Sequence, residues 1–144
     1  MKEFVSKITS TPYSSEQVFA KLSNLENLQP VLSRLDQLPP DLQSKLQDVR
    51  LTSDSVTAVT NMGEFCIRLA EKEPCKTLKF SPDNLPINAN LWVQLLEKTP
   101  GTTHMRLTVK LDIPLMLRPL VGNKLDQLKP ALDKAADMLA NIAY

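Results

Sequence analysis

Few side chains in this sequence are of the types that carry chemistry, and their spacing does not bring them together. The two cysteines, Cys66 and Cys75, show no CxxC spacing, and the single histidine, His104, lies far from both. A structural zinc site needs four such ligands, so we predict no metal site. No G-x-S-x-G motif, which would present a nucleophilic serine, occurs either. We therefore predict no cofactor and no catalytic residue, with both thiols reduced.

His104 is the remaining candidate for acid–base chemistry. A histidine acts as a general base when a partner orients it in a closed pocket. His104 stands at the start of the last predicted strand, on the same polar face as Arg106. We therefore interpret His104 as a solvated side chain.

The bulk properties exclude several function classes. The chain has 144 residues, of which 42% are hydrophobic and 23% charged, so we expect one globular domain over residues 1–144. Lys plus Arg (17) nearly balance Asp plus Glu (16), which leaves no basic footprint for nucleic acid. No run approaches the ~20 apolar residues of a membrane span, and MKEFVSKITS is not a signal peptide. We expect a cytoplasmic protein that inserts into no membrane.

The N-terminal segment predicts a strand followed by a capped helix. Residues 3–10 are interpreted as a strand with one buried face, with Phe4, Ser6 and Ile8 on one face and Val5, Lys7 and Thr9 on the other. Its inward face would hold Phe4, Ser6 and Ile8. Ser14 and Gln17 then have capping-box spacing, and apolar residues follow at helical intervals to Leu28. Further short helical segments are predicted at 31–38 and 41–46.

From about residue 48 the pattern changes to a period of two. It predicts six strands, in VRLTSDSVTAVT (two), GEFCIRLAEKEP, KTLKFS, NLWVQLLEK and TTHMRLTVKLDI. With the first strand they make a seven-stranded antiparallel sheet, because the connections are short. After Pro114 a helical stripe follows, made of Leu117, Val121, Leu125, Leu128, Leu132, Ala135, Leu139 and Ile142.

The hairpin formed by the last two strands has two possible registers. A loop with an odd number of residues pairs Val93 with Leu107, whereas an even number pairs Val93 with Thr108. A slip of one residue moves every side chain to the other face, and a two-residue Pro-Gly loop would splay the strands. We therefore predict the odd loop. This register puts Trp92 on the outer face, beside Thr108.

A sheet with one apolar face and a long helix with one apolar stripe bury these surfaces against each other. We therefore expect an α+β fold with the helix across the concave side of the sheet. The order of elements, with PYSSEQVFAKLSNLENL and ALDKAADMLANI, resembles the helix-grip (SRPBCC) superfamily over essentially the whole chain. That superfamily includes START-type lipid-transfer domains, birch-pollen-allergen-type proteins and polyketide cyclases, and the nearest resemblance is to small bacterial polyketide-cyclase-like proteins. It implies a cavity for a lipid, sterol, aromatic polyketide or other apolar molecule.

The inward residues are then candidates to line that cavity, or, alternatively, an ordinary solid core. They are almost all apolar, and Ser6 and Thr60 could orient a ligand. The candidates are Phe4, Ser6, Ile8, Val56, Ala58, Thr60, Phe65, Ile67, Leu69, Leu78, Phe80, Leu91, Val93, Leu95, Met105, Leu107, Val109, Leu111, Leu117, Val121, Leu125, Leu128 and Leu132.

Three functions follow from this reading. We favour non-catalytic binding of a small apolar molecule. Cyclases and aromatases of the superfamily often place acids, bases or hydroxyls inside the cavity, and the inward set holds almost none. An interaction module or homodimer would instead use the outer face around Trp92, unless Leu96 and the stems of Arg106 and Lys110 cover that ring. The other charges of that face, Glu64, Arg68 and Glu97, are interpreted as solvated.

Overall fold

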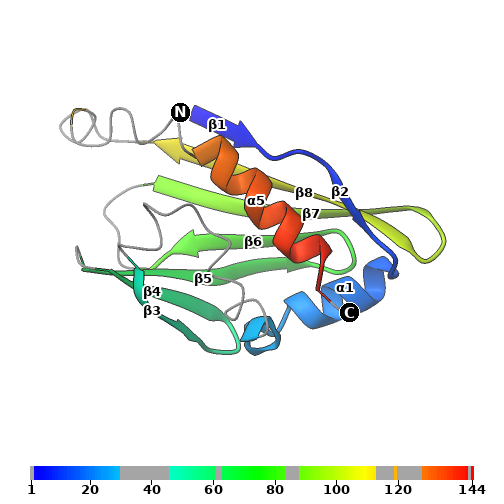
Figure 1. Cartoon of the computed structure of the whole chain (residues 1–144), viewed down its shortest axis with the longest axis horizontal. Coiled ribbons are helices and arrows are strands. Elements are labelled where there is room, and N and C mark those ends of the chain that lie inside the picture. Colours follow the sequence, from blue (N-terminus) through cyan, green and yellow to red (C-terminus); the bar gives the residue numbers. More distant parts are fainter. Residues whose placement is uncertain are drawn as a thin grey trace.

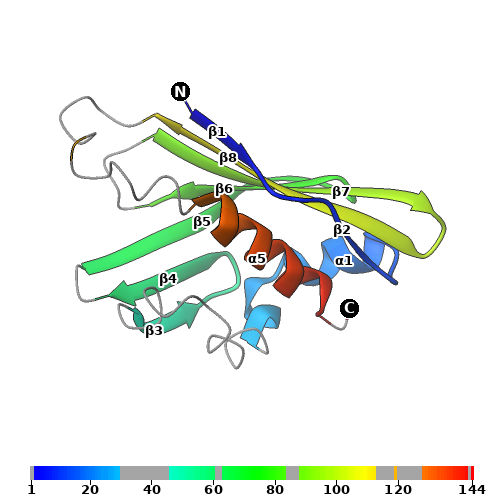
Figure 2. The same ribbon diagram turned by 45° about the horizontal axis from the view of Figure 1, so that its top comes forward.

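A large antiparallel sheet curls around a C-terminal helix in the computed structural model (Figures 1 and 2). The structure describes residues 2–29, 46–60, 63–83, 88–112, 119, 128–142 and 144. Its elements are β1 (Lys2–Val5), β2 (Thr9–Thr11), α1 (Ser15–Leu22), the 3-10 helix η1 (Leu25–Leu28), β3 (Leu46–Leu51), β4 (Ser55–Thr60), β5 (Gly63–Glu73), β6 (Thr77–Pro82), β7 (Asn88–Thr99), β8 (Thr102–Asp112) and α5 (Leu128–Ala140).

The strand order in the sheet is β1-β8-β7-β6-β5-β4-β3, with β2 also paired to β8. From β3 to β8 each strand pairs with the next one along the chain, as the short connections predicted. The first two strands join the far end of this meander. The predicted α+β helix-grip architecture is confirmed, with eight strands among the described residues rather than seven, because the first predicted strand is divided in two.

Helix α1 begins at the predicted capping box. Ser14 Oγ accepts a hydrogen bond from Gln17 N–H at 3.2 Å, and Gln17 Oε1 accepts one from Ser14 N–H at 3.1 Å. The helix ends earlier than predicted, because Asn24 is extended and its side chain caps the N–H of Glu26 at the start of η1. The helical segments predicted at 31–38 and 41–46 fall almost entirely outside the described residues.

The predicted register of the last hairpin is confirmed. Val93 of β7 lies opposite Leu107 of β8, and Trp92 lies opposite Thr108. Val93 and Leu107 are both buried, so their face of the sheet is the inner one. Apolar residues thus meet apolar residues across the central pair of strands.

The loop that produces this register differs from the one predicted. Thr99 pairs with Thr102, so the loop holds two residues, and Gly101 has the positive φ of +80° that the third position of a type II turn requires. A one-residue bulge between Leu96 and Thr99 supplies the extra residue. The prediction of a loop with an odd number of residues was therefore wrong. The bulge adds the one residue that keeps Val93 opposite Leu107, which is the register that was predicted.

A second bulge divides the first predicted strand. Phe4 pairs with Val109 and Thr9 with Met105, so five steps along the first strand match four along β8. Ser6 fills the irregularity, since its Oγ accepts a hydrogen bond from Leu107 N–H at 2.9 Å. The extra residue turns the next side chains over. Ile8, predicted to face inward, is instead 64% exposed on the outer side.

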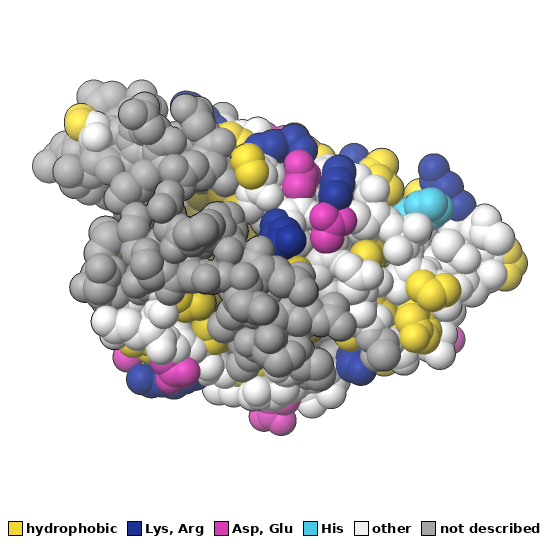
Figure 3. Space-filling view, in the orientation of Figure 1, with side chains coloured by type: hydrophobic (Ala, Val, Ile, Leu, Met, Phe, Trp, Pro, Cys, Tyr) yellow, Lys and Arg dark blue, Asp and Glu magenta, His cyan; other side chains and the backbone are white. Residues whose placement is uncertain are grey.

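Helix α5 covers the edge of the sheet at this bulge. Lys7 N–H donates to Asp133 Oδ1 at 2.6 Å, and Lys7 Nζ lies 2.8 Å from Asp137 Oδ2. The Lys7 N–H bond, helped by Lys129, holds the pKa of the Asp133 carboxyl below its usual range. Figure 3 shows basic and acidic side chains interleaved over this region. The helix thus occupies a backbone N–H at the break between β1 and β2, where another strand would otherwise find a donor.

The core forms where α5, α1 and η1 meet the inner face of the sheet. Its buried members are Val18, Leu22, Leu25, Leu78, Phe80, Val93, Leu95, Met105, Leu107, Leu132 and Ala136. The described part of the predicted stripe is confirmed: Leu132 and Ile142 are buried, and Leu128, Ala135 and Leu139 pack against the core. Its earlier members, Leu117, Val121 and Leu125, lie outside the described residues.

Glu97 ties the tip of the β7–β8 hairpin to the start of α1. Its carboxylate accepts hydrogen bonds from Gly101 N–H at 3.0 Å and from the N–H and hydroxyl of Ser15 at 2.7 and 2.9 Å. These bonds, that of Gly101 foremost, hold the pKa of Glu97 below its usual value. Glu97 is therefore only partly exposed, and its charge is engaged in hydrogen bonds that its interpretation as a solvated residue did not include.

The substitution Glu97→Gln is expected to lower the thermal midpoint of unfolding at pH 7. The folded pKa of Glu97 is depressed, so its contribution to stability is present above the ordinary glutamate pKa, about 4.3, and disappears as the pH falls through the folded pKa. The gap between wild type and variant should therefore close in acid. Melting curves from pH 7 to 3 measure it. Glu71→Gln is the control, because Glu71 is exposed and its contact with Lys79 Nζ is a long one of 4.0 Å. A gap that is constant with pH would contradict this.

Two buried threonines opposite each other provide a matched pair of variants. Thr103 Oγ1 donates to Tyr13 O at 2.7 Å, whereas Thr11 Oγ1 is buried without a hydrogen-bond partner among the described residues. Thr11→Val should raise the free energy of unfolding by about 1 kcal/mol, and Thr103→Val should lower it by about 1 kcal/mol. Urea denaturation measures both. Equal changes in the two variants would mean that the hydroxyls do not differ in this way.

Candidate functional site

An apolar cavity lies between the inner face of the sheet, α5 and the α1–η1 segment. Figure 2 shows these helices on the concave side of the sheet. Its volume is about 190 Å³. Thirteen described residues line it, and all of them are apolar: Leu22, Leu25, Leu28, Val56, Ile67, Leu78, Phe80, Leu91, Val93, Leu107, Ala135, Met138 and Leu139.

The alternation of side chains along each strand places the sheet part of this lining. Leu78 and Phe80 are two residues apart on β6, as are Leu91 and Val93 on β7, so each pair points to the same side. The pairings Val93–Leu78 and Val56–Ile67 extend that side across the neighbouring strands. The cavity floor is therefore a continuous apolar surface over β4 to β8.

Two helical segments form the other described parts of the wall. Ala135 and Leu139 are four residues apart on α5, so they lie on one face of the helix, and Met138 borders them. Leu25 and Leu28 of η1 add to the wall next to the β3–β4 turn, where Leu25 N–H donates to Ser53 O. Every described part of the wall contributes aliphatic or aromatic groups, which makes the interior suitable for an apolar guest and unfavourable for an uncompensated polar one.

The structure places seven of the candidate residues at the cavity wall: Val56, Ile67, Leu78, Phe80, Leu91, Val93 and Leu107. Other candidates are part of the core without lining the cavity, namely Phe4, Leu69, Leu95, Met105, Val109, Leu128 and Leu132. A role in ligand binding remains a prediction for all of them.

The two candidate polar groups lie elsewhere. Ser6 Oγ is occupied by Leu107 N–H and by Lys7 O, to which it donates at 2.8 Å. Thr60 Oγ1 donates to Gly63 O at 2.9 Å, at the β4–β5 turn. Both hydroxyls satisfy local backbone groups and do not line the cavity, so neither is placed to orient a ligand.

Four further candidates do not line the cavity. Ile8 is turned outward by the bulge, and Phe65 is 36% exposed near the end of β5. Ala58, opposite Phe65, and Leu111, near the end of β8, are both half-buried. Alternation places Phe65 on the side of Ile67, but the lining described for the cavity stops short of this end of β5. Leu117, Val121 and Leu125 are outside the described residues.

The sequence reading missed the helical part of the lining. Leu22, Leu25 and Leu28 follow one another at three-residue intervals, and this spacing could have placed them together on one face of a helix that lines the cavity. Ala135 and Leu139 belong to the predicted stripe but were not assigned to the cavity. Met138 lies outside that stripe, and nothing in the spacing marked it.

The residues with chemical potential lie away from the cavity. His104 is on the outer face of β8, opposite Leu96, and Cys66 alternates with the inward Ile67 on β5. Cys75 is in the β5–β6 turn with a positive φ of 62°. Within the part of the chain that the structure describes, no group of three His, Cys, Asp or Glu residues could hold a metal ion.

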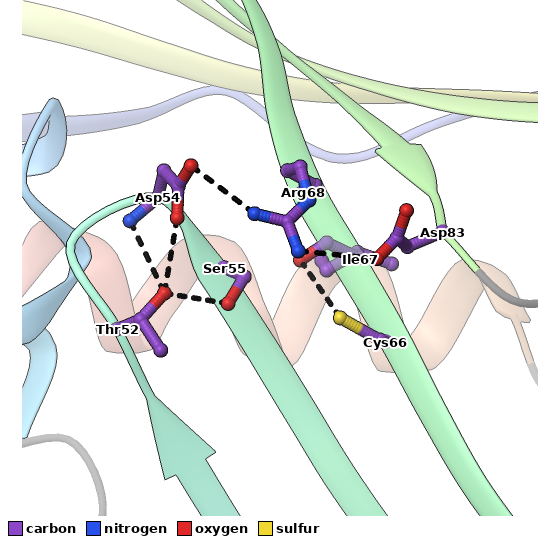
Figure 4. A network of polar contacts seen from close by, with 7 residues as sticks. All are labelled: Thr52, Asp54, Ser55, Cys66, Ile67, Arg68 and Asp83. Atoms are coloured by element: carbon purple, nitrogen blue, oxygen red, sulfur yellow. Dashed lines mark hydrogen bonds and ion pairs between the residues drawn. The ribbon is translucent and has the colours of Figure 1, made fainter.

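A polar cluster holds the end wall in place (Figure 4). Arg68 donates to Asp54 at 3.2 Å and to Asp83 at 3.1 Å, and the Asp83 bond with both carboxylate charges raises the pKa of the guanidinium. Asp54 belongs to the β3–β4 turn, where Ser53 O accepts a hydrogen bond from Leu25 N–H at 2.9 Å. The exposed Arg68 cluster thus positions η1, whose leucines form the wall.

Trp92 is half-buried on the outer face between two lysines. The Nζ atoms of Lys79 and Lys110 lie 5.6 and 5.5 Å from the ring centroid, within the range of a cation–π contact. Covering of the ring by Leu96 and the stems of Arg106 and Lys110 was one of the two predicted alternatives. Lys110 does lie at the ring, but the second cation there is Lys79. Arg106 donates to Gln94 at 2.8 Å. No described helix is long and apolar enough to cross a membrane.

Comparisons place this geometry among known folds. No protein-family model matches the chain, and no curated protein matches its sequence. The protein XoxI from Bacillus cereus has 16% identity and a TM-score of 0.59, over 97% of this chain and 94% of that one. A START superfamily protein from Mycobacterium smegmatis has 13% identity and a TM-score of 0.50, over 95% and 98% of the two chains.

An enzyme is also among the similar structures. Truncated norcoclaurine synthase from Thalictrum flavum has 10% identity and a TM-score of 0.62, over 96% of this chain and 91% of that one. The synthase is also known in complex with dopamine and hydroxybenzaldehyde. At such identities the likeness concerns the fold alone, which is the helix-grip fold that the sequence resembles.

The cavity is expected to take up xenon. An apolar cavity of ~150 Å³ binds xenon or benzene in other proteins, so methyl resonances of Val93 and Leu107 should shift with xenon pressure. The methyls of Val5, on the outer face opposite Thr108, serve as the control. Ala135→Leu, which adds three carbons at the wall, should remove the shifts. Shifts that survive this filling would place the xenon elsewhere.

Proposed function

We propose that this helix-grip chain binds a small apolar molecule in the cavity between its sheet and α5, without catalysing a reaction. The observation that carries the proposal is the lining, which is apolar at all thirteen described positions. A guest in such a site is held by burial of its apolar surface, at roughly 25 cal/mol per Å². It needs no polar partner inside.

The volume supports a guest of at least single-ring size. The cavity measures about 190 Å³, against ~150 Å³ for an apolar cavity that holds benzene. A lipid segment, a terpenoid or sterol-like ring, and an aromatic or polyketide-like ring all have the required apolar character. Norcoclaurine synthase, which shares the fold, is known with two small aromatic molecules, in line with a ring-sized guest here.

The absence of catalysis is proposed from the same lining. General acid–base chemistry requires a proton donor or acceptor within hydrogen-bond reach of the substrate. None of the described lining residues carries one, and Ser6 and Thr60 are engaged by backbone groups. Nothing in the described lining therefore favours an enzyme of the cyclase or aromatase kind.

Native mass spectrometry of the protein purified from the cells that produce it tests the proposal. We expect one small apolar species, close to one per chain, released on denaturation. Ala135→Leu, which fills the cavity, should lose it. The control, Ala20→Leu, adds the same atoms on the exposed side of α1 and should retain it.

Two results would contradict the proposal. A chain that stays bare over several growth conditions would mean that the cavity has no resident guest. A guest retained equally by Ala135→Leu, with unchanged stoichiometry, would mean that binding occurs outside the cavity.

A further inference from the structure

A second hollow lies on the outer face of the sheet, where β7 and β8 approach their hairpin. It measures about 180 Å³, and we call it the outer groove. Its lining consists of Ile8, Gln94, Leu96, Lys98, His104 and Arg106, together with Leu95 and Met105, whose side chains are buried in the core. Figure 3 shows apolar, basic and histidine side chains gathered toward this end of the hairpin.

Two large apolar side chains are exposed at the groove. Ile8 is 64% exposed and Leu96 is 55% exposed, and the third large apolar residue exposed among those described, Phe65, lies on another strand. Ile8 reaches the outer face only because the bulge after Ser6 reverses the alternation. Exposed apolar residues that share one hollow, unlike scattered ones, mark an interaction site.

The charges around these residues have one sign. Lys98 and Arg106 contribute cations, and no carboxylate is among the eight lining residues. The Arg106 contact described in the structure is to the neutral Gln94, and neither cation forms an ion pair with a described residue. Two other lysines of the outer face, Lys79 and Lys110, are by contrast paired with Glu71 at 4.0 Å and with Glu3 at 3.5 Å. An anionic partner is thus the complement that the groove lacks.

We propose that the outer groove binds an extended protein segment in which a large apolar side chain is flanked by acidic residues. The apolar side chain lies between Ile8 and Leu96, and the flanking carboxylates pair with Lys98 and Arg106. The groove offers two exposed apolar side chains, Ile8 and Leu96, at a hollow of about 180 Å³. It suits one anchoring side chain, as at the centre of protein interfaces.

Other occupants fit less well. A two-fold contact of the groove with a second copy would bring Lys98 and Arg106 against their own equivalents, and like charges across an interface are unfavourable. A bilayer is attached through a broad apolar surface, whereas this site is a hollow with two exposed apolar residues. A protruding side chain on an acidic segment satisfies both the shape and the charge.

Fluorescence anisotropy with a defined probe tests the proposal. The probe is a fluorescein-labelled peptide, Gly-Glu-Glu-Leu-Leu-Glu-Glu-Gly, titrated with the protein at low salt. We expect saturable binding that weakens with salt and falls at least tenfold in Leu96→Ser and in Arg106→Gln. The same peptide with lysine in place of glutamate should not bind.

Matched controls separate the groove from general surface effects. Phe65→Ser removes an exposed apolar side chain elsewhere, and Arg50→Gln removes an exposed cation of β3. Both should bind like wild type, and so should Ala135→Leu, whose change is in the cavity. Thermal melts of Leu96→Ser and Arg106→Gln should match wild type, because these side chains are exposed.

Three results would overturn the proposal. The first is the absence of binding at millimolar protein in low salt. The second is binding that is unchanged in both groove variants. The third is sedimentation with phosphatidylserine vesicles that depends on Leu96 and Arg106 while the peptide does not bind, which would identify a membrane surface as the occupant.

Discussion

The register between β7 and β8 determines the face on which the other side chains of the sheet lie. With Val93 opposite Leu107, the neighbouring Trp92 and Thr108 must point outward, since side chains alternate along a strand. β6 aligns to β7, and β1 and β2 align to β8, so one choice of register extends across the sheet. The same register therefore places the sheet residues of the apolar cavity on the inner face, and Gln94, Leu96, His104 and Arg106 of the outer groove on the outer face.

The features that could be predicted from the sequence are periodic or local. The capping box depends on Ser14 and Gln17 within one turn of helix, and the strands from β3 to β8 follow from alternation along each segment. The hairpin register could be chosen because only one alignment opposes apolar residues. These signals depend on neighbours in the sequence, so no knowledge of the tertiary structure is needed to read them.

The bulges could not be predicted in the same way. Residues 3–10 contain no glycine or proline that would mark a bulge, and the irregularity at Ser6 exists because its hydroxyl meets the N–H of Leu107, 101 residues away. Ile8 was therefore placed on the wrong face. The cavity has a similar cause, since whether inward side chains fill the space depends on how Met138 of α5 meets strands that are distant in sequence. The polarity pattern along a strand indicates which residues face inward. Whether those residues contact one another or leave a cavity depends on the packing of distant segments.

The contact between α5 and the N-terminal strands has a consequence for the order in which the chain folds. Lys7 is bonded to Asp133 and Thr9 to Ala136, contacts that span 126 and 127 residues, and β1 and β2 pair only with β8. During synthesis these first strands leave the ribosome long before their partners exist. The β3–β8 meander, whose pairings are between successive strands, can form earlier because the loops it closes are short. The N-terminal strands should then dock last, together with α5, as the closing step of folding.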